Sequence, residues 1–322
     1  MSQLNITKVE KTIVPINQKP TRIQRFKKEF NRGKYVYLML LPVILYYVIF
    51  QYWPMIGVVI GFQNYIPGLG FFESPWVGFK HFTDFFHSFY FWRLIKNTFI
   101  LNFWLLIFGF PAPIILALLL NEVRQSWFKR TVQTVTYIPH FISMVVIVGI
   151  IKDFTATDGI INQLRDLLGR ETITFLQIPE YFRTIYVSSD IWQSIGWSSI
   201  IYFAALSAVD PNLYEAAEMD GAGRFRKMWH ITLPAIKPTI VILLILTIGN
   251  LLSSGFEKIL LLYQPLTYET ADVISTYVYR KGIEDSSFSF ATAVGLFNTV
   301  VNFVLLIIAN SISKKVSDNS LW

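Results

Sequence analysis

The sequence predicts an all-α membrane protein with six transmembrane helices. Three observations lead to this fold class: an apolar composition, six long apolar segments, and an uneven distribution of lysine and arginine between the segments. Of the 322 residues, 53% are hydrophobic and only 15% are charged, and the mean hydropathy is +0.45. Soluble proteins carry about a quarter charged residues, so this composition indicates a chain whose surroundings are largely lipid.

Six segments are long and apolar enough to be transmembrane helices. A spanning helix needs roughly 20 mostly apolar residues, because the hydrocarbon core is about 30 Å thick and each residue rises 1.5 Å. The fourth segment is the least apolar, and a re-entrant or core helix is its alternative interpretation. The predicted spans are residues 35–60, 97–120, 134–151, 185–207, 236–255 and 291–312.

The positive charges predict the orientation of these spans. If the N-terminus is cytoplasmic, the tails and inner loops hold 18 of the 28 lysine and arginine residues. Such an excess on the cytoplasmic side is typical of membrane proteins. The formal net charge of +7 is then explained by topology and does not require a nucleic-acid partner. We therefore expect both termini in the cytoplasm.

The chain divides into a basic tail, a membrane domain and a short second tail. Residues 1–34 are polar and basic without an apolar core, so we expect no cleavable signal peptide. Ile23, Phe26 and Phe30 fall on one helical face within 20–34, which suits a helix in the inner membrane interface; a solvated basic tail is the alternative. Residues 35–313 form the predicted six-span domain, and residues 314–322 a cytoplasmic tail.

Several kinds of chemistry are excluded by what the sequence lacks. It has no cysteine and only four scattered histidines, so we predict no disulfide and no metal site. It has no G-x-x-x-x-G-K-[ST] motif, so we predict that this chain does not itself bind ATP through a P-loop. The motifs H-E-x-x-H and G-x-S-x-G are absent as well, and we predict no catalytic residues.

The segment 208–235, between the fourth and fifth spans, is polar and compact. Asp210 is suited to cap a helix whose first residue is Pro211, and a second short helix runs to Pro234. Gly221 or Gly223 allows the turn between the two helices. The sequence thus predicts a rigid helix–turn–helix on the cytoplasmic side. Small side chains would let another protein approach closely, at Ala216, Ala217, Gly221 and Ala222.

This segment carries a family resemblance. "EAAEMDGAGRFRKMWHITLP" resembles the EAA loop of bacterial ABC importer permeases, in which EAA is followed by a glycine and then by I-x-LP. The resemblance implies the type I ABC importer permease fold, with the EAA helix as the coupling helix seated on an ATPase. The ATPase-coupling residues would be Glu215, Ala216, Ala217, Asp220, Gly221, Ala222, Arg224, Leu233 and Pro234.

Other segments resemble the carbohydrate permeases of the oligosaccharide or polysaccharide type (LplB-like), which are related to maltose permeases. These segments include "LMLLPVILYYVIFQYWPM", "PAPIILALLLNEVR" and "QTVTYIPHFIS". The resemblance implies a bacterial cell-membrane importer with a second homologous permease, two ABC ATPase subunits that hold ATP and Mg, and an extracytoplasmic sugar-binding protein. This chain itself would bind no cofactor. It departs from the maltose type in the loop 152–184, which is too short for the large external domain found there.

The resemblance leaves alternatives open. The EAA loop also occurs in importers of other solutes, so a non-sugar ABC permease is the nearest alternative. An intramembrane enzyme is a further alternative, although no catalytic motif supports it. A channel or secondary transporter would not need a loop that docks on an ATPase. Which oligosaccharide is carried cannot be read from the sequence.

Polar side chains inside the later spans are candidates for the substrate pathway. Buried polar groups are costly in a membrane and often functional, and sugars are bound by hydrogen bonds and aromatic rings. Bonds between neighbouring helices and interfacial anchoring of tryptophan are the alternative roles. Pro111, Pro113 and Pro139 would be hinges or static kinks. The pathway candidates are Trp192, Gln193, Trp197, Asn250, Ser253, Asn298 and Asn302.

Overall fold

The computed structural model describes residues 22–252 and 255–316, and all of the regular structure in these two ranges is helical. The chain forms two compact units, residues 1–57 and 58–322. The predicted tail residues 1–21 and 317–322, and Ser253, lie outside the described residues. The structure confirms the predicted all-α class.

The first unit is built on one long helix. Helix α1 (Arg22–Tyr47) continues through a π-helical segment (Val48–Tyr52) into a 3₁₀ segment (Trp53–Phe62), whose residues from Val58 onward are counted in the second unit. The backbone is therefore already helical across most of the predicted interfacial segment 20–34, without a break before the first span. The stretch Arg32–Phe62 is long and apolar enough to cross a membrane. Its side chains from Tyr35 to Val48 are exposed, as suits a helix in lipid.

The second unit contains three further helical stretches that are long and apolar enough to cross a membrane. Phe91–Asn121 joins α4 (Phe91–Trp104) and α5 (Pro111–Asn121) through a π-helical turn. Arg224–Gly249 joins α11 (Arg224–Lys227) and α12 (Leu233–Gly249) in the same way. The third is α16 (Phe288–Val316), most of which forms the stretch Phe288–Lys315. These positions agree with the predicted spans two, five and six.

The predicted third span is not a straight helix. Helix α6 (Ser126–Tyr137) and a 3₁₀ turn (Ile138–Phe141) are separated from α7 (Met144–Thr155) by two extended residues, and the helix direction changes by 104°. Pro139 has no N–H group with which to continue the helical ladder, so the regular helix ends just before it. The two arms together count as a broken span or a re-entrant loop.

Helix α9 (Pro179–Ser207) contains the predicted fourth span and is the centre of the second unit. It is a single helix of 29 residues, but it is not among the helices apolar enough to be counted as spans. It packs against α5, α6 and α12. Gly196 lies directly on the backbone of α6 at Thr136, where a Cβ atom would collide. The count of six spans therefore stays a prediction.

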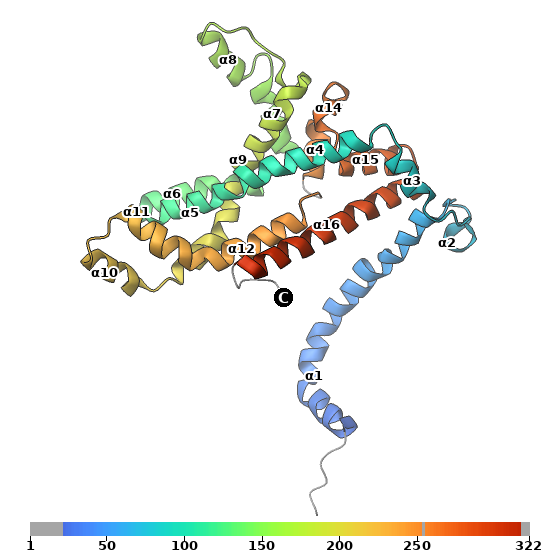
Figure 1. The fold of residues 1–322 in the computed structure, drawn as a ribbon, viewed down its shortest axis with the longest axis horizontal. Helices are drawn as coiled ribbons and strands as arrows, with labels where there is room; N and C mark the ends of the chain where they lie inside the picture. Colours follow the sequence, from blue (N-terminus) through green and yellow to red (C-terminus); the bar gives the residue numbers. More distant parts are fainter. Residues whose placement is uncertain (1–21, 253–254, 317–322) are drawn as a thin grey trace, which may run out of the picture. The chain divides into compact units, whose positions relative to one another are not determined.

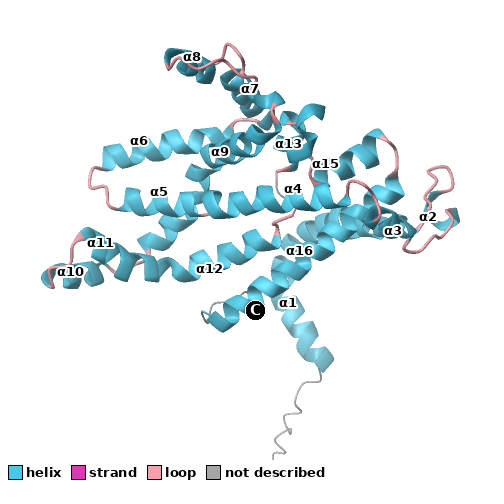
Figure 2. Ribbon diagram, turned by 45° about the horizontal axis from the view of Figure 1, so that its top comes forward, coloured by secondary structure: helices cyan, strands magenta, loops and turns pink. Residues whose placement is uncertain are grey.

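Short helices complete the second unit. Both views place α10 (Pro211–Met219) and α11 at one end of α5 and α12 and α15 toward the other end (Figures 1 and 2), and Figure 1 shows α14 near α15. Three buried apolar clusters hold the helices together. The remaining helices are α2 (Gly70–Glu73), α3 (Lys80–Phe86), α8 (Ile160–Leu167), α13 (Phe256–Leu262), α14 (Tyr268–Ala271) and α15 (Ile274–Tyr279).

Candidate functional site

The polar loop between α9 and α12 has the predicted helix–turn–helix form. The Asp210 carboxylate accepts a hydrogen bond from the Asn212 backbone N–H (2.9 Å), and Pro211 is the first residue of α10. This is the N-cap arrangement that satisfies a free donor at the start of a helix. Only three residues, Ala208 to Asp210, separate α9 from α10. The link between α9 and α10 is therefore very short.

Gly221 makes the turn that ends α10. Its φ is +74°, in the left-handed region, whereas Gly223 has an ordinary φ of −70°. The Ala222 N–H donates to the Ala217 carbonyl (2.8 Å) and the Gly221 N–H to the Glu218 carbonyl (3.0 Å). This pair of bonds defines a Schellman motif, which closes a helix with glycine in the left-handed conformation. The sequence left the choice between the two glycines open, and the structure decides it for Gly221.

Two side-chain contacts brace the loop. The Tyr214 hydroxyl and the buried Thr232 hydroxyl are 3.0 Å apart, joining α10 to the π-helical turn before α12. Lys227 Nζ lies 3.4 Å from a Glu218 carboxylate oxygen, joining α11 to α10. The loop is thus fixed to α12 as well as to α9.

Most of the predicted coupling residues are accessible. Glu215, Ala216, Asp220, Gly221, Arg224 and Pro234 are exposed, and Ala217, Ala222 and Leu233 are half-buried. The same loop exposes large apolar side chains that the sequence analysis did not single out, namely Leu213, Met219, Phe225 and Trp229. Apolar residues within a polar, cytoplasmic-type segment were the signal that could have revealed them. Exposed apolar side chains of this kind suit a protein-binding surface.

A cavity of about 670 Å³ lies among the long helices of the second unit. Its walls come from α4, α5 and the π-helical turn between them, from α9, and from the end of α12. Most of the lining is apolar, and a few polar groups converge on it, which is typical of small-molecule sites. The tryptophan and the polar residues of the wall are Asn102, Asp190, Ser194, Trp197, Ser198, Thr247 and Asn250.

Two of the predicted pathway residues line this cavity. Trp197 stacks on His140, with the ring centroids 4.6 Å apart and the planes 4° from parallel, and it also meets the edge of Phe141. These contacts fix the indole ring on the cavity wall. Asn250 donates a hydrogen bond to the Leu246 carbonyl (3.1 Å) at the end of α12, which holds its amide in place there.

The other predicted pathway residues lie elsewhere. Trp192 is exposed on α9 away from the cavity, and Gln193 is buried. Asn298 donates to the Leu252 carbonyl (3.3 Å), and the Asn302 side chain accepts from the Leu252 N–H (2.9 Å). Both asparagines therefore tie α16 to the turn after α12, the helix-joining role that the sequence analysis kept as an alternative.

Asp190, on the wall of the cavity, forms an ion pair with Lys258. Lys258 Nζ, on α13, lies 3.5 Å from an Asp190 carboxylate oxygen and 3.4 Å from the Gln193 side-chain oxygen. The Lys258 side chain is only 1% exposed, whereas Asp190 is partly exposed and lines the cavity. Asp190 lies within the predicted fourth span, 185–207, but is not one of the predicted pathway residues. Its partner lies 68 residues away, so no local pattern could have paired them.

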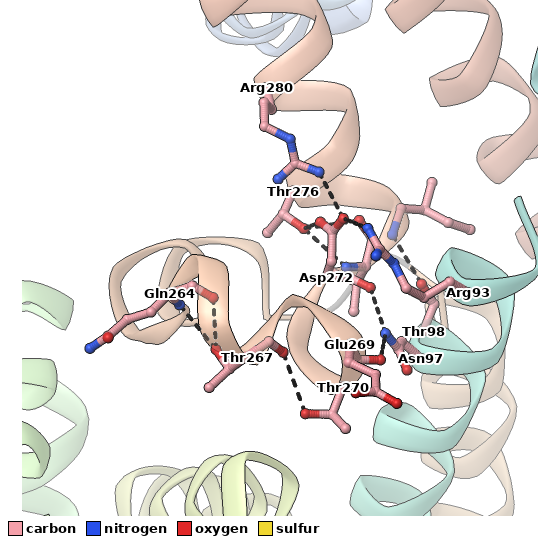
Figure 3. Close-up of polar contacts among 12 residues, drawn as sticks. Arg93, Asn97, Thr98, Gln264, Thr267, Glu269, Thr270, Asp272, Thr276 and Arg280 are labelled. Atoms are coloured by element: carbon pink, nitrogen blue, oxygen red, sulfur yellow. Dashed lines mark hydrogen bonds and ion pairs between the residues drawn. The ribbon is translucent and has the colours of Figure 1, made fainter. Parts of the chain in front are cut away.

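A second polar network joins α4 to the segment of α14 and α15 at the other end of the unit (Figure 3), and Arg183 links α9 to it. The fully buried Asp272 carboxylate accepts from Arg280 Nη2 (2.7 Å) and pairs with Arg93 Nη2 (3.3 Å). Asn97 donates to the Asp272 and Glu269 carbonyls and accepts from Arg183 Nη2. Burial lowers the pKa of Arg280, but the hydrogen bond and the charge of Asp272 outweigh it and hold that pKa above its usual value.

Metal chemistry finds no support in the described part of the chain. Within residues 22–252 and 255–316, no three histidine or carboxylate side chains gather into a group that could hold a metal ion.

The chain belongs to the family of binding-protein-dependent transport system inner membrane components, which matches residues 109–318. It is therefore a permease subunit of an ABC transporter, a multi-pass membrane protein whose role is transport rather than enzyme catalysis. This membership confirms the class of protein that the EAA loop predicted, and it argues against the alternatives of an enzyme, a channel or a secondary transporter.

Close relatives share most of the chain. It is 50% identical to protein LplB of Bacillus subtilis over 293 residues, covering 91% of this chain and 92% of that protein. It is also 50% identical over 306 residues to the polygalacturonan/rhamnogalacturonan transport system permease protein YteP of the same organism, covering 92% and 95%.

A solved structure confirms the fold. A chain of a bacterial ABC transporter involved in the import of the acidic polysaccharide alginate matches with a TM-score of 0.85 and 46% identity, covering 91% of this chain and 99% of that one. A second structure of a bacterial alginate transporter, in complex with an alginate pentasaccharide-bound periplasmic protein, also matches with a TM-score of 0.85, at 45% identity, covering 92% and 100%.

Proposed function

We propose that this chain is one of two homologous permeases in an ATP-driven importer of oligosaccharides. An extracytoplasmic binding protein delivers the sugar, two copies of an ABC ATPase hold ATP and Mg, and both ends of this chain face the cytoplasm. The saccharide substrate is supported by the relatives, which include a polygalacturonan/rhamnogalacturonan permease and an alginate importer. The orientation is supported by the excess of lysine and arginine in the predicted inner segments.

One structural observation carries the proposal. The two helices that flank the EAA loop, α9 and α12, are both walls of the 670 Å³ cavity. The loop is joined to α9 by three residues and to α12 by the Tyr214–Thr232 contact. A displacement of the loop therefore displaces two walls of the cavity together. This connection is what an ATPase needs in order to change access to a sugar site.

The EAA loop is the proposed docking element for the ATPase. Its charged residues Glu215, Asp220 and Arg224 would lie against the partner, and exposed Met219 and Phe225 would fill an apolar groove on it. ATP binding would draw the two ATPases and the loops of both permeases together and open the spans outward. Hydrolysis would then restore the inward-facing state.

The cavity is the proposed sugar site of this subunit. The Trp197 ring offers a flat apolar surface for a pyranose face, and Asn250, Ser194 and Ser198 offer hydrogen-bonding groups for hydroxyls. Asp190 adds a carboxylate acceptor whose charge is balanced by Lys258. Gln193, Asn298 and Asn302 would act indirectly, by holding the helices around the cavity.

Gentle purification of the chain from its own membranes tests the assembly. We expect a second six-span permease and an ATPase to co-purify, and we expect Gly221→Trp to lose the ATPase and uptake while still inserting. Gly78→Trp is the matched control, because Gly78 also has a positive φ (+59°) and an open surface but lies outside the loop. A chain that purifies alone, or a Gly221→Trp variant with normal uptake, would contradict the proposal.

Two tryptophans of α9 test the sugar site. Trp192 and Trp197 are both 44% exposed, but only Trp197 lines the cavity. We expect Trp197→Ala to raise the KM for sugar uptake about tenfold through loss of ring contacts, and Trp192→Ala to change it less than twofold. Equal effects of the two substitutions on KM would place the sugar elsewhere.

A further inference from the structure

A second pocket, of about 390 Å³, lies beside the Asp272 network and outside the predicted spans. Its volume falls within the range of small-molecule sites, about 300–1,000 Å³. We call it the basic–aromatic pocket, and it is separate from the cavity described above. Three cationic and three aromatic side chains of its wall define it, namely Tyr90, Arg93, Tyr268, Tyr277, Arg280 and Lys281.

The aromatic rings and the guanidinium groups of this pocket are interleaved. The Arg93 guanidinium carbon lies 4.9 Å from the Tyr90 ring centroid, and that of Arg280 lies 4.7 Å from Tyr268 and 5.6 Å from Tyr277. These contacts hold flat cations and flat rings in fixed positions. Carboxylates match the guanidinium geometry well, while the apolar face of a sugar ring packs on tyrosine.

Most of the charged side chains that line the pocket are cations, and each of the three is paired with a carboxylate outside the lining. The cations of the wall are Arg93, Arg280 and Lys281, and the lining carboxylate is Glu269, which is exposed. Asp272 pairs with both arginines but is fully buried. Lys281 is also paired with Asp285, 2.7 Å away and 46% exposed. Among the residues that line the pocket, cations therefore outnumber anions.

Both guanidinium groups retain donors that the protein does not use. Arg93 Nε and Arg280 Nη1 are buried and have no hydrogen-bond acceptor, although each arginine bonds Asp272 through Nη2. Buried donors without acceptors are rare in native proteins and call for an explanation. Both atoms are buried, so an acidic oxygen in the pocket would supply the missing acceptor once the guanidinium group turned toward it.

We propose that the basic–aromatic pocket binds a uronate unit of an acidic oligosaccharide, before the sugar enters the cavity. The carboxylate lies between Arg93, Arg280 and Lys281, and the ring packs on the tyrosines. Helix α4 carries Arg93 near its start and the cavity residue Asn102 nine residues later, about 14 Å along the axis. Successive units of one oligosaccharide chain can span that distance. The inference rests on the proposed function.

Uptake assays on the assembled transporter test this inference with three probes: trigalacturonate, its neutral methyl ester, and maltotriose. We expect wild type to take up trigalacturonate with the lowest KM of the three. Lys281→Gln should raise that KM about fivefold and leave the KM of the ester within twofold. Lys281→Arg should restore it. Lys80→Gln, an exposed lysine on α3 outside the pocket, is the matched control and should have no effect.

Asp285→Asn should lower the KM for trigalacturonate, whereas Lys281→Gln should raise it, and structural damage would not lower a KM. It removes the carboxylate that competes for Lys281, so the KM for trigalacturonate should fall about twofold to threefold, with no change for the ester.

The other possible results would contradict either the uronate site or the proposed sugar function. Uptake of maltotriose or the ester with no preference for the acid overturns the uronate site alone, and uptake of none of the three also removes the proposed sugar function. Lys281→Gln could instead raise the KM for acidic and neutral cargo by the same factor and weaken the dependence of uptake on binding-protein concentration. That result would make the pocket a docking surface for the binding protein.

Discussion

The EAA loop and the Asp272 network are both built from polar residues, yet they are held in opposite ways. In the loop, each described hydrogen bond or ion pair joins residues no more than 18 positions apart. In the Asp272 network, Arg93 and Asn97 bond residues 172 to 179 positions away, and Arg183 bonds Asn97 across 86 positions. One region is shaped locally, and the other is shaped by the packing of distant helices.

This difference follows from what each region has to do. A loop with a self-contained shape can present the same surface while the helices on either side of it move. A network that crosses four helices instead fixes those helices to one another. The loop is therefore suited to transmit motion, and the network to resist it.

The largest expected loss of stability comes from Asp272→Ala, in the Asp272 network. The substitution leaves Arg93 and Arg280 without their shared, fully buried carboxylate. Removing one partner of a buried ion pair costs about 3–5 kcal/mol of unfolding free energy. Thermal unfolding of the purified complex in mild detergent should show a clear drop in Tm, together with a lower yield of inserted protein.

Asp285→Ala is the matched control for that comparison. Asp285 also pairs with a cation at 2.7 Å, but its side chain is 46% exposed, and exposed pairs contribute about 0–1 kcal/mol. The Tm should therefore hardly change. If both substitutions lowered Tm equally, burial would not explain the stability of the network.

A smaller effect is expected in the loop, from Gly221→Ala. Gly221 has a φ of +74° with no atom near its Cβ position, and Gly223 has equally open surroundings but a φ of −70°. An L-residue in the left-handed region costs roughly 1–2 kcal/mol, so Gly221→Ala should loosen the turn and lower sugar-coupled ATP hydrolysis severalfold. Gly223→Ala should leave it nearly unchanged.

Hydrolysis that responded equally to the two alanine substitutions would show that the left-handed turn is not what shapes the loop. The comparison would then rest on the small size of both glycines at a docking surface. Because both positions have open surroundings, steric differences within the chain cannot account for such a result.

The sequence by itself determined the helical membrane class, the positions of the most apolar spans and the helix–turn–helix of the EAA loop. These features depend on local causes: apolar length sets a span, an Asp-Pro pair starts a helix, and glycine ends one. Asp210 and Pro211 could be assigned, and the turn could be narrowed to Gly221 or Gly223, because the partners of these residues lie within a few positions. The family was recognisable for the same reason, since its motif is contiguous.

Only the tertiary structure decided which polar residues meet. Trp197 and Asn250 share a cavity while Trp192 does not, although α9 carries both tryptophans. Asp190 pairs with Lys258, 68 positions away, and Arg93 pairs with Asp272, 179 positions away. The bend after Pro139 likewise depends on where α7 packs. Helical periodicity says which side a residue faces but not which helix lies opposite, and that choice is made by packing over the whole unit.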